Sequence, residues 1–362
     1  MKMKQTTILL FILYFLILAG AVTVFYLKYV RNYTPVETQA LQIETVSLQP
    51  LIYYSKVNIL STVDPVIKDG TTNTETFETQ GEIGALDLNK SQSQLTYEQK
   101  NTSSNWEIWQ GDTSNIEKEK IAFINEAKFG NYQDFTKPKY SPDMSKLAFL
   151  ASGSTTDTIF VENLLTGTFQ KIIEDSTIKI ADFSWDKASE KIIYCSSNPS
   201  AGQSKNACFT VTKEGEENTK LFEQEVKKVS WNKTDEIFYL SRADTPHIYT
   251  AGSANQNNTQ IDDVATPKKI VNFQINPTGK KIVYEIVSDQ KSDIYLSDIN
   301  GTNRFQLTDD GNANQPIFAD STTQEIAFLR QKDGIYTINF NKTNEQKIVS
   351  LKDTINFLLL WR

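Results

Sequence analysis

Beyond about Ile52, the apolar residues of the chain come in short runs, and no stretch keeps a 3.6-residue apolar period over ten or more positions. The runs are rich in Ile, Val, Tyr and Phe, and clusters of Asn, Asp, Gly, Ser and Thr separate them; examples are LAFLA, KIIYC, EIFYL, KKIVYEIV and EIAFLR. This pattern is typical of strands joined by tight turns. Because no helical segment intervenes, the sequence predicts an antiparallel all-β domain.

The strand pattern repeats along the chain. A short polar turn precedes each I/L-x-[FY] strand, and taking residues 142, 185, 231, 277 and 319 as equivalent gives steps of 43, 46, 46 and 42 residues. A unit of this length that holds about four strands is the sequence signature of a β-propeller blade. Gly279 lies in the turn of one unit, and this alignment puts Met144, Lys187 and Lys233 at its position in the three preceding units.

Two segments carry a family resemblance: YSPDMSKLAFLA, and NPTGKKIVYEIVSDQKSDIYLSDINGTNRFQLTDDGNANQPIF with the following EIAFLR. They resemble the TolB-type WD-like propeller repeat, in which a strand ending S-P-D-G is followed by K-I-A-F, D-I-Y-x-x-D-x-D-G and x-x-L-T. The resemblance extends over most of residues 84–353 and implies the propeller fold. It does not imply one function, because the same repeat serves binding scaffolds, accessory domains of serine peptidases and periplasmic envelope proteins.

The chain ends in an apolar run, residues 355–362, which we expect to form an inner strand that completes the first blade. Closure by both ends of the domain would remove the open sheet edges. The segments LIYYSKV, NILSTV and TETFET can supply the other three strands of that blade. The sequence therefore predicts a propeller domain over residues 46–362 with six or seven four-stranded blades, of which seven is favoured.

The N-terminal region predicts a membrane segment. Residues 6–27 contain no charged side chain, and a helix of this length reaches about 33 Å, enough for a hydrocarbon core of about 30 Å. Because the head of residues 1–5 is short, we expect a transmembrane signal-anchor with the rest of the chain exported, and residues 28–45 as a spacer. A cleaved signal peptide is the alternative, since Ala19-Gly20-Ala21 has the form of a cleavage site.

The charge of the chain limits its partners. Residues 35–362 contain 33 basic and 44 acidic side chains, and the whole chain has a net charge of −7. A nucleic-acid binder needs clustered positive charge against phosphates, so the sequence predicts no nucleic-acid partner. One histidine and two cysteines exclude a zinc-finger set or a His-rich metal centre, and we expect no metal and no cofactor.

Catalytic motifs are missing from the sequence, which has no P-loop, no G-x-G-x-x-G after a strand and no G-x-S-x-G nucleophile elbow. His247 is the only histidine, and no flanking motif supports a Ser-His-Asp triad around it. The sequence therefore favours a protein that is not an enzyme. A carboxylate-based glycan hydrolase or a metal-dependent hydrolase is the alternative, and two carboxylates roughly 5–10 Å apart at the channel mouth would favour a glycosidase.

The loop DDGNAN is a candidate cation site. It offers oxygen ligands for Ca²⁺, although it lacks the D-x-D-x-D-G spacing of a strong site; they are Asp309, Asp310, Asn312 and Asn314. Turn chemistry in a loop between two blades is the alternative.

The two cysteines are a candidate disulfide. Cys195 ends one strand and Cys208 begins the next, so an antiparallel hairpin brings them near each other. An exported protein meets an oxidising compartment, in which such a pair can form a disulfide. Two buried free thiols are the alternative.

Long connections and aromatic residues gather on the predicted propeller face that carries the b–c and d–a loops. The segment NEAKFGNYQDFT contributes Phe129, Tyr132 and Phe135 to this face. Function concentrates in loops on a rigid scaffold, and aromatic anchors dominate binding energy. We therefore expect a protein partner to dock there, with Tyr132 and Phe135 as contacts; packing of these rings against blade edges is the alternative.

These observations favour a single-pass, membrane-anchored β-propeller outside the cytoplasm of a prokaryotic cell. We expect it to act as a non-enzymatic protein-binding or scaffolding module of the cell envelope, held to the membrane by residues 6–27. Besides the enzyme alternative, a sensor or assembly subunit of an envelope complex is a third class, in which the membrane helix itself makes contacts.

Overall fold

The computed structural model divides the chain into two compact units, Met1–Gln49 and Pro50–Arg362. It describes the backbone of residues 52–361 apart from 57–58, 64–74, 79–81, 90–93, 113–120, 155, 174–177, 197–205, 252–257, 320–323 and 351–356, and side chains within residues 82–350. The predicted head, membrane helix and spacer, residues 1–45, lie outside the described residues. Within the described part, no helix is long and apolar enough to cross a membrane.

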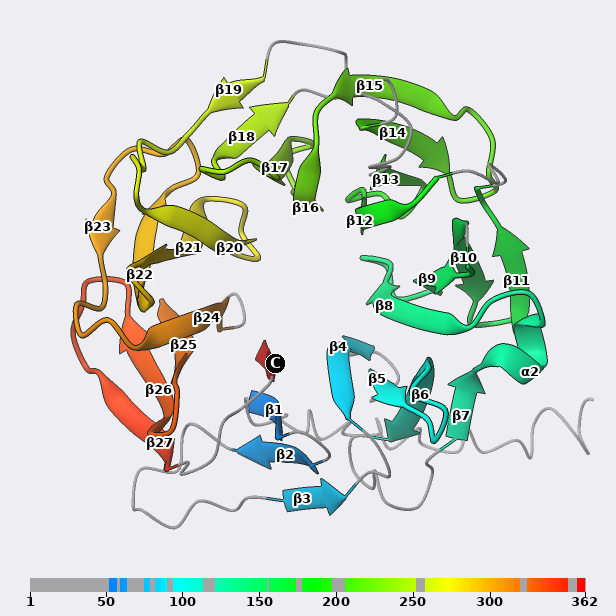
Figure 1. Cartoon of the computed structure of the whole chain (residues 1–362), viewed down its shortest axis with the longest axis horizontal. Coiled ribbons are helices and arrows are strands. Elements are labelled where there is room, and N and C mark those ends of the chain that lie inside the picture. The colour runs from blue at the N-terminus through cyan, green and yellow to red at the C-terminus, as the bar shows by residue number, and fades with distance from the viewer. Residues whose placement is uncertain are drawn as a thin grey trace, which may run out of the picture. The chain divides into compact units, whose positions relative to one another are not determined.

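The second unit is a ring of seven four-stranded sheets in which neighbouring strands are antiparallel (Figure 1). Six of these sheets are blades described with their side chains, and each follows the order a, b, c, d from the centre of the ring outward. The inner a strands are β4 (Ile83–Asn89), β8 (Asp134–Tyr140), β12 (Ile180–Trp185), β16 (Val226–Trp231), β20 (Lys269–Ile275) and β24 (Ala313–Phe318). The predicted all-β propeller of four-stranded blades is confirmed.

The other three strands of each blade follow in chain order. The b strands are β5 (Gln94–Lys100), β9 (Lys146–Ser152), β13 (Lys191–Ser196), β17 (Ile237–Ser241), β21 (Lys281–Ser288) and β25 (Glu325–Arg330). The c strands are β6 (Trp106–Asp112), β10 (Asp157–Asn163), β14 (Ala207–Thr212), β18 (Ile248–Ala251), β22 (Lys291–Asp298) and β26 (Gly334–Asn339). The d strands are β7 (Ile121–Ile124), β11 (Thr168–Lys171), β15 (Thr219–Glu223), β19 (Thr259–Gln260), β23 (Phe305–Gln306) and β27 (Gln346–Ser350).

The seventh sheet, described by its backbone alone, is built from both ends of the unit. Its strand order is β28 (Phe357–Trp361), β1 (Ile52–Lys56), β2 (Ile59–Val63) and β3 (Glu75–Glu78). The C-terminal strand therefore pairs with β1, as the apolar run at 355–362 predicts. This pairing joins the two ends of the unit by backbone hydrogen bonds and covers the edge that β1 would otherwise expose.

The hydrophobic core lies between neighbouring blades because alternate residues of a strand point to opposite faces of its sheet. In β13, Ile192 packs with residues of the preceding blade, and its neighbour Ile193 packs with residues of the following blade. The b strands carry the longest buried runs, such as the fully buried LAF of β9. The short apolar runs of the sequence are thus strands with both faces buried.

The turn between the a and b strands has the same geometry in four consecutive blades. The fourth residue of the turn donates its N–H to the carbonyl of the first and has a positive φ of 59–73°; the pairs are Met144 with Ser141, Ser189 with Asp186, Asp235 with Asn232, and Gly279 with Asn276. The first residue also caps the turn through its side chain, as when the Asn276 Oδ1 accepts the N–H of Lys280 and Lys281.

This geometry corrects the alignment of the turn glycine. Met144 is equivalent to Gly279, as the sequence suggests, but Ser189 and Asp235 take that place in the next two blades, not Lys187 and Lys233. The sequence alignment matches Trp185 and Trp231 with Pro277, whereas the tryptophans end their strands one residue before the capping residue.

Among the described residues of the propeller, one helical turn interrupts the strands. The helix α2 (Glu126–Phe129) lies in the d–a connection between β7 and β8, where the sequence pattern predicts only a loop. The Asn125 side chain accepts the Lys128 N–H at 3.2 Å, which is a normal N-cap contact, and Gly130 ends the turn with a φ of 42°.

Candidate functional site

The predicted aromatic contacts belong to a packed cluster. Phe135 is completely buried in β8, and its ring lies 5.6 Å from that of Phe129 and 6.3 Å from that of Phe149. Phe129, half-buried, also packs against Phe160 at 4.8 Å, because α2 turns the ring down onto the blade. The prediction that Phe135 contacts a partner is therefore wrong, since a fully buried ring presents no surface.

Tyr132 is half-buried and meets Phe160 edge-on, with 5.7 Å between the ring centroids. The cluster fixes one side of this ring and leaves part of it exposed. A partner contact through Tyr132 or Phe129 stays a prediction, and the larger part of the aromatic signal is explained by packing under the loop.

The acidic residues of the DDGNAN loop form ion pairs with basic side chains. Asp309 binds the Lys342 ammonium at 3.0 Å, and Asp310 binds the Arg330 guanidinium at 2.5 Å. Asn312 is exposed, while the buried Oδ1 of Asn314 has no hydrogen-bond partner among the described residues. No group of three or more His, Cys, Asp or Glu side chains that could hold a metal ion occurs among the described residues. The loop geometry therefore gives the calcium hypothesis no support.

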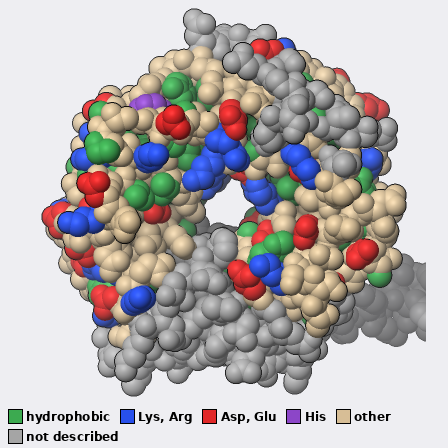
Figure 2. All heavy atoms as spheres, in the orientation of Figure 1, with side chains coloured by type: hydrophobic (Ala, Val, Ile, Leu, Met, Phe, Trp, Pro, Cys, Tyr) green, Lys and Arg blue, Asp and Glu red, His purple; other side chains and the backbone are tan. Residues whose placement is uncertain are grey.

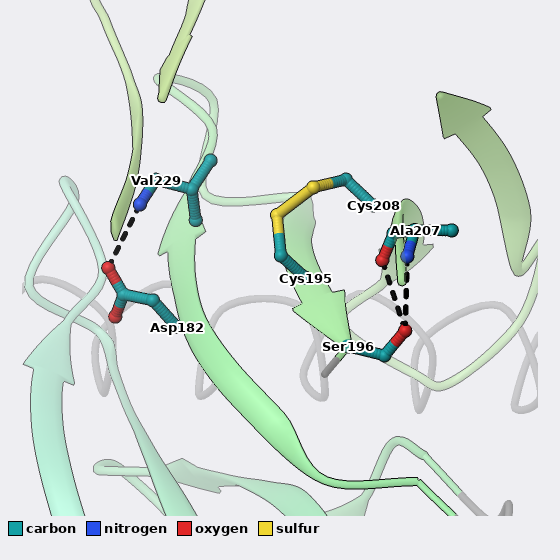
Figure 3. Close-up of a disulfide and its surroundings, with 6 residues drawn as sticks. All are labelled: Asp182, Cys195, Ser196, Ala207, Cys208 and Val229. Carbon is teal, nitrogen blue, oxygen red and sulfur yellow. Dashed lines mark hydrogen bonds between the residues drawn. A yellow bond between two sulfur atoms is a disulfide. The ribbon is translucent and has the colours of Figure 1, made fainter. Parts of the chain in front are cut away.

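The predicted disulfide is present. Cys195 of β13 and Cys208 of β14 are directly opposite in the register and are joined through their sulfur atoms, and both are fully buried (Figure 3). Ser196 and Ala207, the next pair along the hairpin, are linked through the serine hydroxyl (Figure 3). The disulfide therefore closes the loop end of the b–c hairpin.

The carboxylates of the described inner strands serve the backbone. Asp87 of β4 accepts the N–H of Tyr140 in the next blade at 2.6 Å, and Asp134 of β8 accepts the N–H of Trp106 at 2.8 Å. Asp182 of β12 accepts the N–H of Val229 in the next blade at 3.0 Å (Figure 3). Each carboxylate therefore ties strands together.

His247 likewise makes local contacts. Its Nδ1 lies 2.7 Å from an oxygen of Asp262, whose other oxygen accepts the N–H of Ile248. The His247 N–H in turn donates to the Ser241 hydroxyl at 3.0 Å. These bonds fix the start of β18 and the end of β17.

Lysines line the inner strands on one side of the ring. Figure 2 shows Lys and Arg side chains gathered beside the central opening of the ring. The inner strands β8 and β16 supply four lysines, which we call the channel lysine cluster: Lys137, Lys139, Lys227 and Lys228. The sequence alone does not single out these residues, because the chain as a whole is acidic.

Each lysine of the cluster reaches forward to the inner strand of the next blade. The ammonium groups of Lys137 and Lys139 donate to the backbone carbonyls of Ala181 and Phe183 in β12. Lys139 also binds Asp182 at 2.9 Å, and Lys137 lies 3.8 Å from the same carboxylate oxygen. One carboxylate thus serves two lysines.

The second pair of lysines has neutral partners. Lys227 donates to the carbonyl of Val271 at 2.9 Å, and Lys228 donates to the Asn272 side-chain oxygen at 2.8 Å, both in β20. Among the residues that the structure describes, neither ammonium group has a carboxylate within ion-pair distance. The cluster therefore carries an excess of positive charge.

The pKa values follow from this arrangement. Burial lowers the pKa of Lys228 to about 8, and the neighbouring lysines act in the same direction while Asp182 opposes them. Burial likewise lowers the pKa of Lys137. Burial alone would raise the pKa of Asp182, but Lys139 and Lys137 hold it below its usual range. The carboxylate is thus committed to its two lysines, and Lys228 is a half-buried cation with no negative charge of its own.

A sequence signal for the cluster exists. Lys137 in KPKYS and Lys228 in VKKVSW lie at the same distance, four residues, before the capping residue of the a–b turn of their blades. Recognising them as neighbours requires knowing that the inner strands meet around one opening, which the propeller fold supplies.

The fold and the inner strands define a β-propeller of four-stranded blades with a cationic patch at its centre. No protein-family model matches the chain, and no curated protein sequence matches it significantly. Among solved structures, the chain is similar to TolB from Acinetobacter baumannii, with 12% sequence identity, a TM-score of 0.54, and coverage of 84% of this chain and 80% of that one.

Two further similarities are to enzymes. Oligogalacturonate lyase from Vibrio parahaemolyticus has 11% identity and a TM-score of 0.57 over 83% of this chain and 85% of its own. A prolyl endopeptidase has 13% identity and a TM-score of 0.58 over 83% of this chain and 49% of its own. At these identities the similarities establish the propeller fold alone.

Proposed function

We propose that the chain is a non-enzymatic protein-binding module of the cell envelope, anchored to the membrane by residues 6–27 and exposing its propeller outside the cytoplasm. The observation that carries the binding role is the charge distribution at the centre of the ring. The described inner-strand carboxylates Asp87, Asp134 and Asp182 accept backbone N–H groups, whereas Lys227 and Lys228 have no carboxylate partner among the described residues.

This distribution favours binding over glycoside hydrolysis. A glycosidase needs two carboxylates free to act as acid and as base or nucleophile. The three described inner-strand carboxylates are held in hydrogen bonds between strands, and the pKa of Asp182 is lowered, so this group is a poor proton donor near neutral pH. A rigid ring with a cationic centre instead offers a docking point for a negatively charged partner. The TolB-like fold is compatible with this role and does not by itself establish it.

Recovery of a partner from membranes tests the proposed function. The full-length chain, expressed with a C-terminal affinity tag, is cross-linked in intact cells, purified from solubilised membranes and analysed by mass spectrometry. We expect one envelope protein to be enriched with the wild-type chain and to be lost when the cross-linker is added only after denaturation. The absence of any enriched envelope protein would contradict the proposal.

Topology is tested separately. Protease added to intact cells, or to spheroplasts where an outer membrane is present, should digest the propeller. Complete protection of the propeller, with only the extreme N-terminus accessible, would contradict the extracytoplasmic location.

We further propose that the seventh sheet acts as the blade that closes the ring. Its inner strand β28 comes from the C-terminus, so deletion of residues 356–362 should leave β1 paired with β2 alone. We expect the truncated chain to unfold at a lower denaturant concentration than the full chain and to expose more hydrophobic surface to a dye. Unchanged unfolding would show that six blades suffice.

A further inference from the structure

The channel lysine cluster has the features of a binding site that lacks its anion. Charged groups removed from water are normally paired, because desolvation disfavours the charged form. Lys228 is half-buried and donates to a neutral amide oxygen, and the charges that act most on its pKa after burial are Asp182, Lys139, Lys227 and Lys137. Three of these four neighbours are cations.

The carboxylate that acts on Lys228 is already engaged. Asp182 accepts from Lys139 and from the Val229 N–H, with one oxygen for each, and lies 3.8 Å from Lys137. It therefore neutralises the β8 side of the cluster and holds β12 to β16. The β16 side, Lys227 and Lys228, keeps its two charges.

From this geometry we propose that Lys227 and Lys228, together with Lys139, bind carboxylate groups of an acidic peptide segment that belongs to the protein partner. The inference rests on the proposed function and names the chemistry of the docking point. An ammonium group bound to a carboxylate is a charge-assisted hydrogen bond, which is about twice as strong as a neutral one. A lysine has three donors, so Lys227 and Lys228 can each bind such a ligand while keeping the bond to β20.

The surroundings favour a peptide over a sugar chain. The inner strands that carry the lysines or their acceptors also carry phenylalanines whose rings are completely buried between blades: Phe135 on β8, Phe183 on β12 and Phe273 on β20. These strands therefore expose charges and not ring faces at the opening. A flexible acidic segment needs only carboxylates spaced to meet the lysine ammonium groups, and the flexible lysine side chains can adjust to that spacing.

The excess charge also distinguishes this patch from the rest of the domain. Ten lysines elsewhere on the described blades form ion pairs with carboxylates; for example, Lys191 binds Glu217 at 3.1 Å and Lys213 binds Glu190 at 2.6 Å. An acidic segment is repelled by the net negative charge elsewhere and attracted to the opening, so the field of the domain would guide it to the cluster.

Direct binding of a defined probe tests the site. The probe is a fluorescent tetraglutamate peptide with blocked ends, and a tetraglutamine peptide of the same design is the control. Anisotropy is measured with the purified full-length chain in a non-ionic detergent. We expect saturable binding of tetraglutamate that weakens strongly between about 0.05 M and 0.5 M salt, and no saturable binding of tetraglutamine. Equal binding of the two peptides would overturn the proposal.

Variants locate the binding. K227Q/K228Q should weaken tetraglutamate binding at least tenfold, which corresponds to about 1.4 kcal/mol. The matched control K191Q/K213Q removes the same two charges from the paired lysines and should leave the affinity within about twofold of wild type. K228R, which keeps the charge, should retain most of the affinity. Equal losses in both double variants would mean that the peptide senses net charge alone, and this would overturn the site.

The pH dependence adds a readout that folding defects do not produce. Because the pKa of Lys228 is lowered to about 8, its ammonium is deprotonated as pH rises from about 7 to 9, while glutamate carboxylates remain ionised. We expect wild-type affinity to fall over this range and the affinity of K228R to stay nearly constant. Asp182, Lys137, Lys139 and Lys227 face the same group, and burial also lowers the pKa of Lys137. A constant wild-type affinity up to about pH 9 would contradict a role for Lys228.

The outcomes separate this site from the proposed function. Recovery of the same envelope partner by wild type and by K227Q/K228Q would refute the site and leave the protein-binding role intact. Tetraglutamate binding at the cluster without any recovered envelope partner would support the site and refute the role. Binding of an oligogalacturonide, with no binding of tetraglutamate, would assign the cluster to an anionic glycan and overturn the peptide proposal.

Discussion

Replacement of Phe135 by alanine separates packing from partner binding in the aromatic cluster. The ring is 0% exposed and lies within 5.6 and 6.3 Å of two other aromatic rings, those of Phe129 and Phe149. Truncation of a buried phenylalanine costs about 3–5 kcal/mol, because the lost transfer free energy and the remaining cavity add. Because the surroundings of Phe135 are other large rings anchored on separate elements, we expect little collapse and a cost in the upper part of that range.

Tyr132 offers the matched comparison within the same cluster. Its ring is half-exposed and makes one edge-on contact with Phe160, and an aromatic pair contributes about 0.5–1.5 kcal/mol beyond its buried area. We expect Tyr132→Ala to cost about 1–2 kcal/mol. Phe135→Leu, which conserves most of the volume, should cost less than about 1.5 kcal/mol.

Equilibrium unfolding in guanidinium chloride, followed by far-UV circular dichroism, measures these differences. The order of destabilisation should be Phe135→Ala well above Tyr132→Ala, with Phe135→Leu close to wild type. If Phe135→Ala unfolds at the wild-type midpoint and also fails to recover the envelope partner, the ring is a binding contact and the packing argument is refuted.

Three further predictions concern other parts of the propeller. The double variant Cys195→Ser/Cys208→Ser should lower the free energy of unfolding by about 3 kcal/mol, which is the chain-entropy value for a closed loop of about 14 residues. Mass spectrometry of the unreduced wild type should find no alkylatable thiol, and two reactive thiols would contradict the disulfide. Gly279→Ala should lower the free energy of unfolding in urea by about 1–2 kcal/mol, because φ is 73° at this residue. No steric clash adds to this cost, since the heavy atom nearest to a new Cβ is Thr234 Cγ2 at 3.8 Å. An unchanged midpoint would mean that the turn relaxes. Burial raises the pKa of Glu162 to about 7, so between about pH 4.5 and 7 the folded state keeps a proton that the unfolded state releases, and the stability from this group falls as pH rises through that window. Glu162→Gln should therefore raise the unfolding midpoint at about pH 8 and change it little at about pH 4.5. An equal effect at both pH values would exclude titration of Glu162 as the cause.

The repeat unit and the strand type could be predicted because both are local. Short apolar runs such as KIIYC indicate strands by composition alone, and the blade-length spacing of the turns indicates the propeller. The pairing of Cys195 with Cys208 also follows from a single hairpin, since the two residues flank one connection. In each case the residues that matter are close in the sequence.

The aromatic loop shows what the local sequence does not predict. The segment around Phe129 reads as a solvent-facing loop with unexplained aromatic residues. In the structure, Asn125 caps a helical turn that directs Phe129 toward Phe149 and Phe160 of neighbouring strands. No pattern within the loop reveals those partners, because they lie on strands that the loop contacts only after the blade has formed.

The charge at the centre of the ring follows a rule that only the assembled propeller makes visible. Lys137, Asp182, Lys228 and Asn272 each lie four residues before the capping residue of their a–b turn. The first three each bond to the inner strand of the following blade, through Ala181, Val229 and Asn272 respectively. In three consecutive blades this position thus joins neighbouring blades and contributes to the charge of the opening. A substitution at this position changes an inter-blade bond and a surface charge together, so the ligand chemistry of the channel can change along the ring without any change in the repeat that builds it.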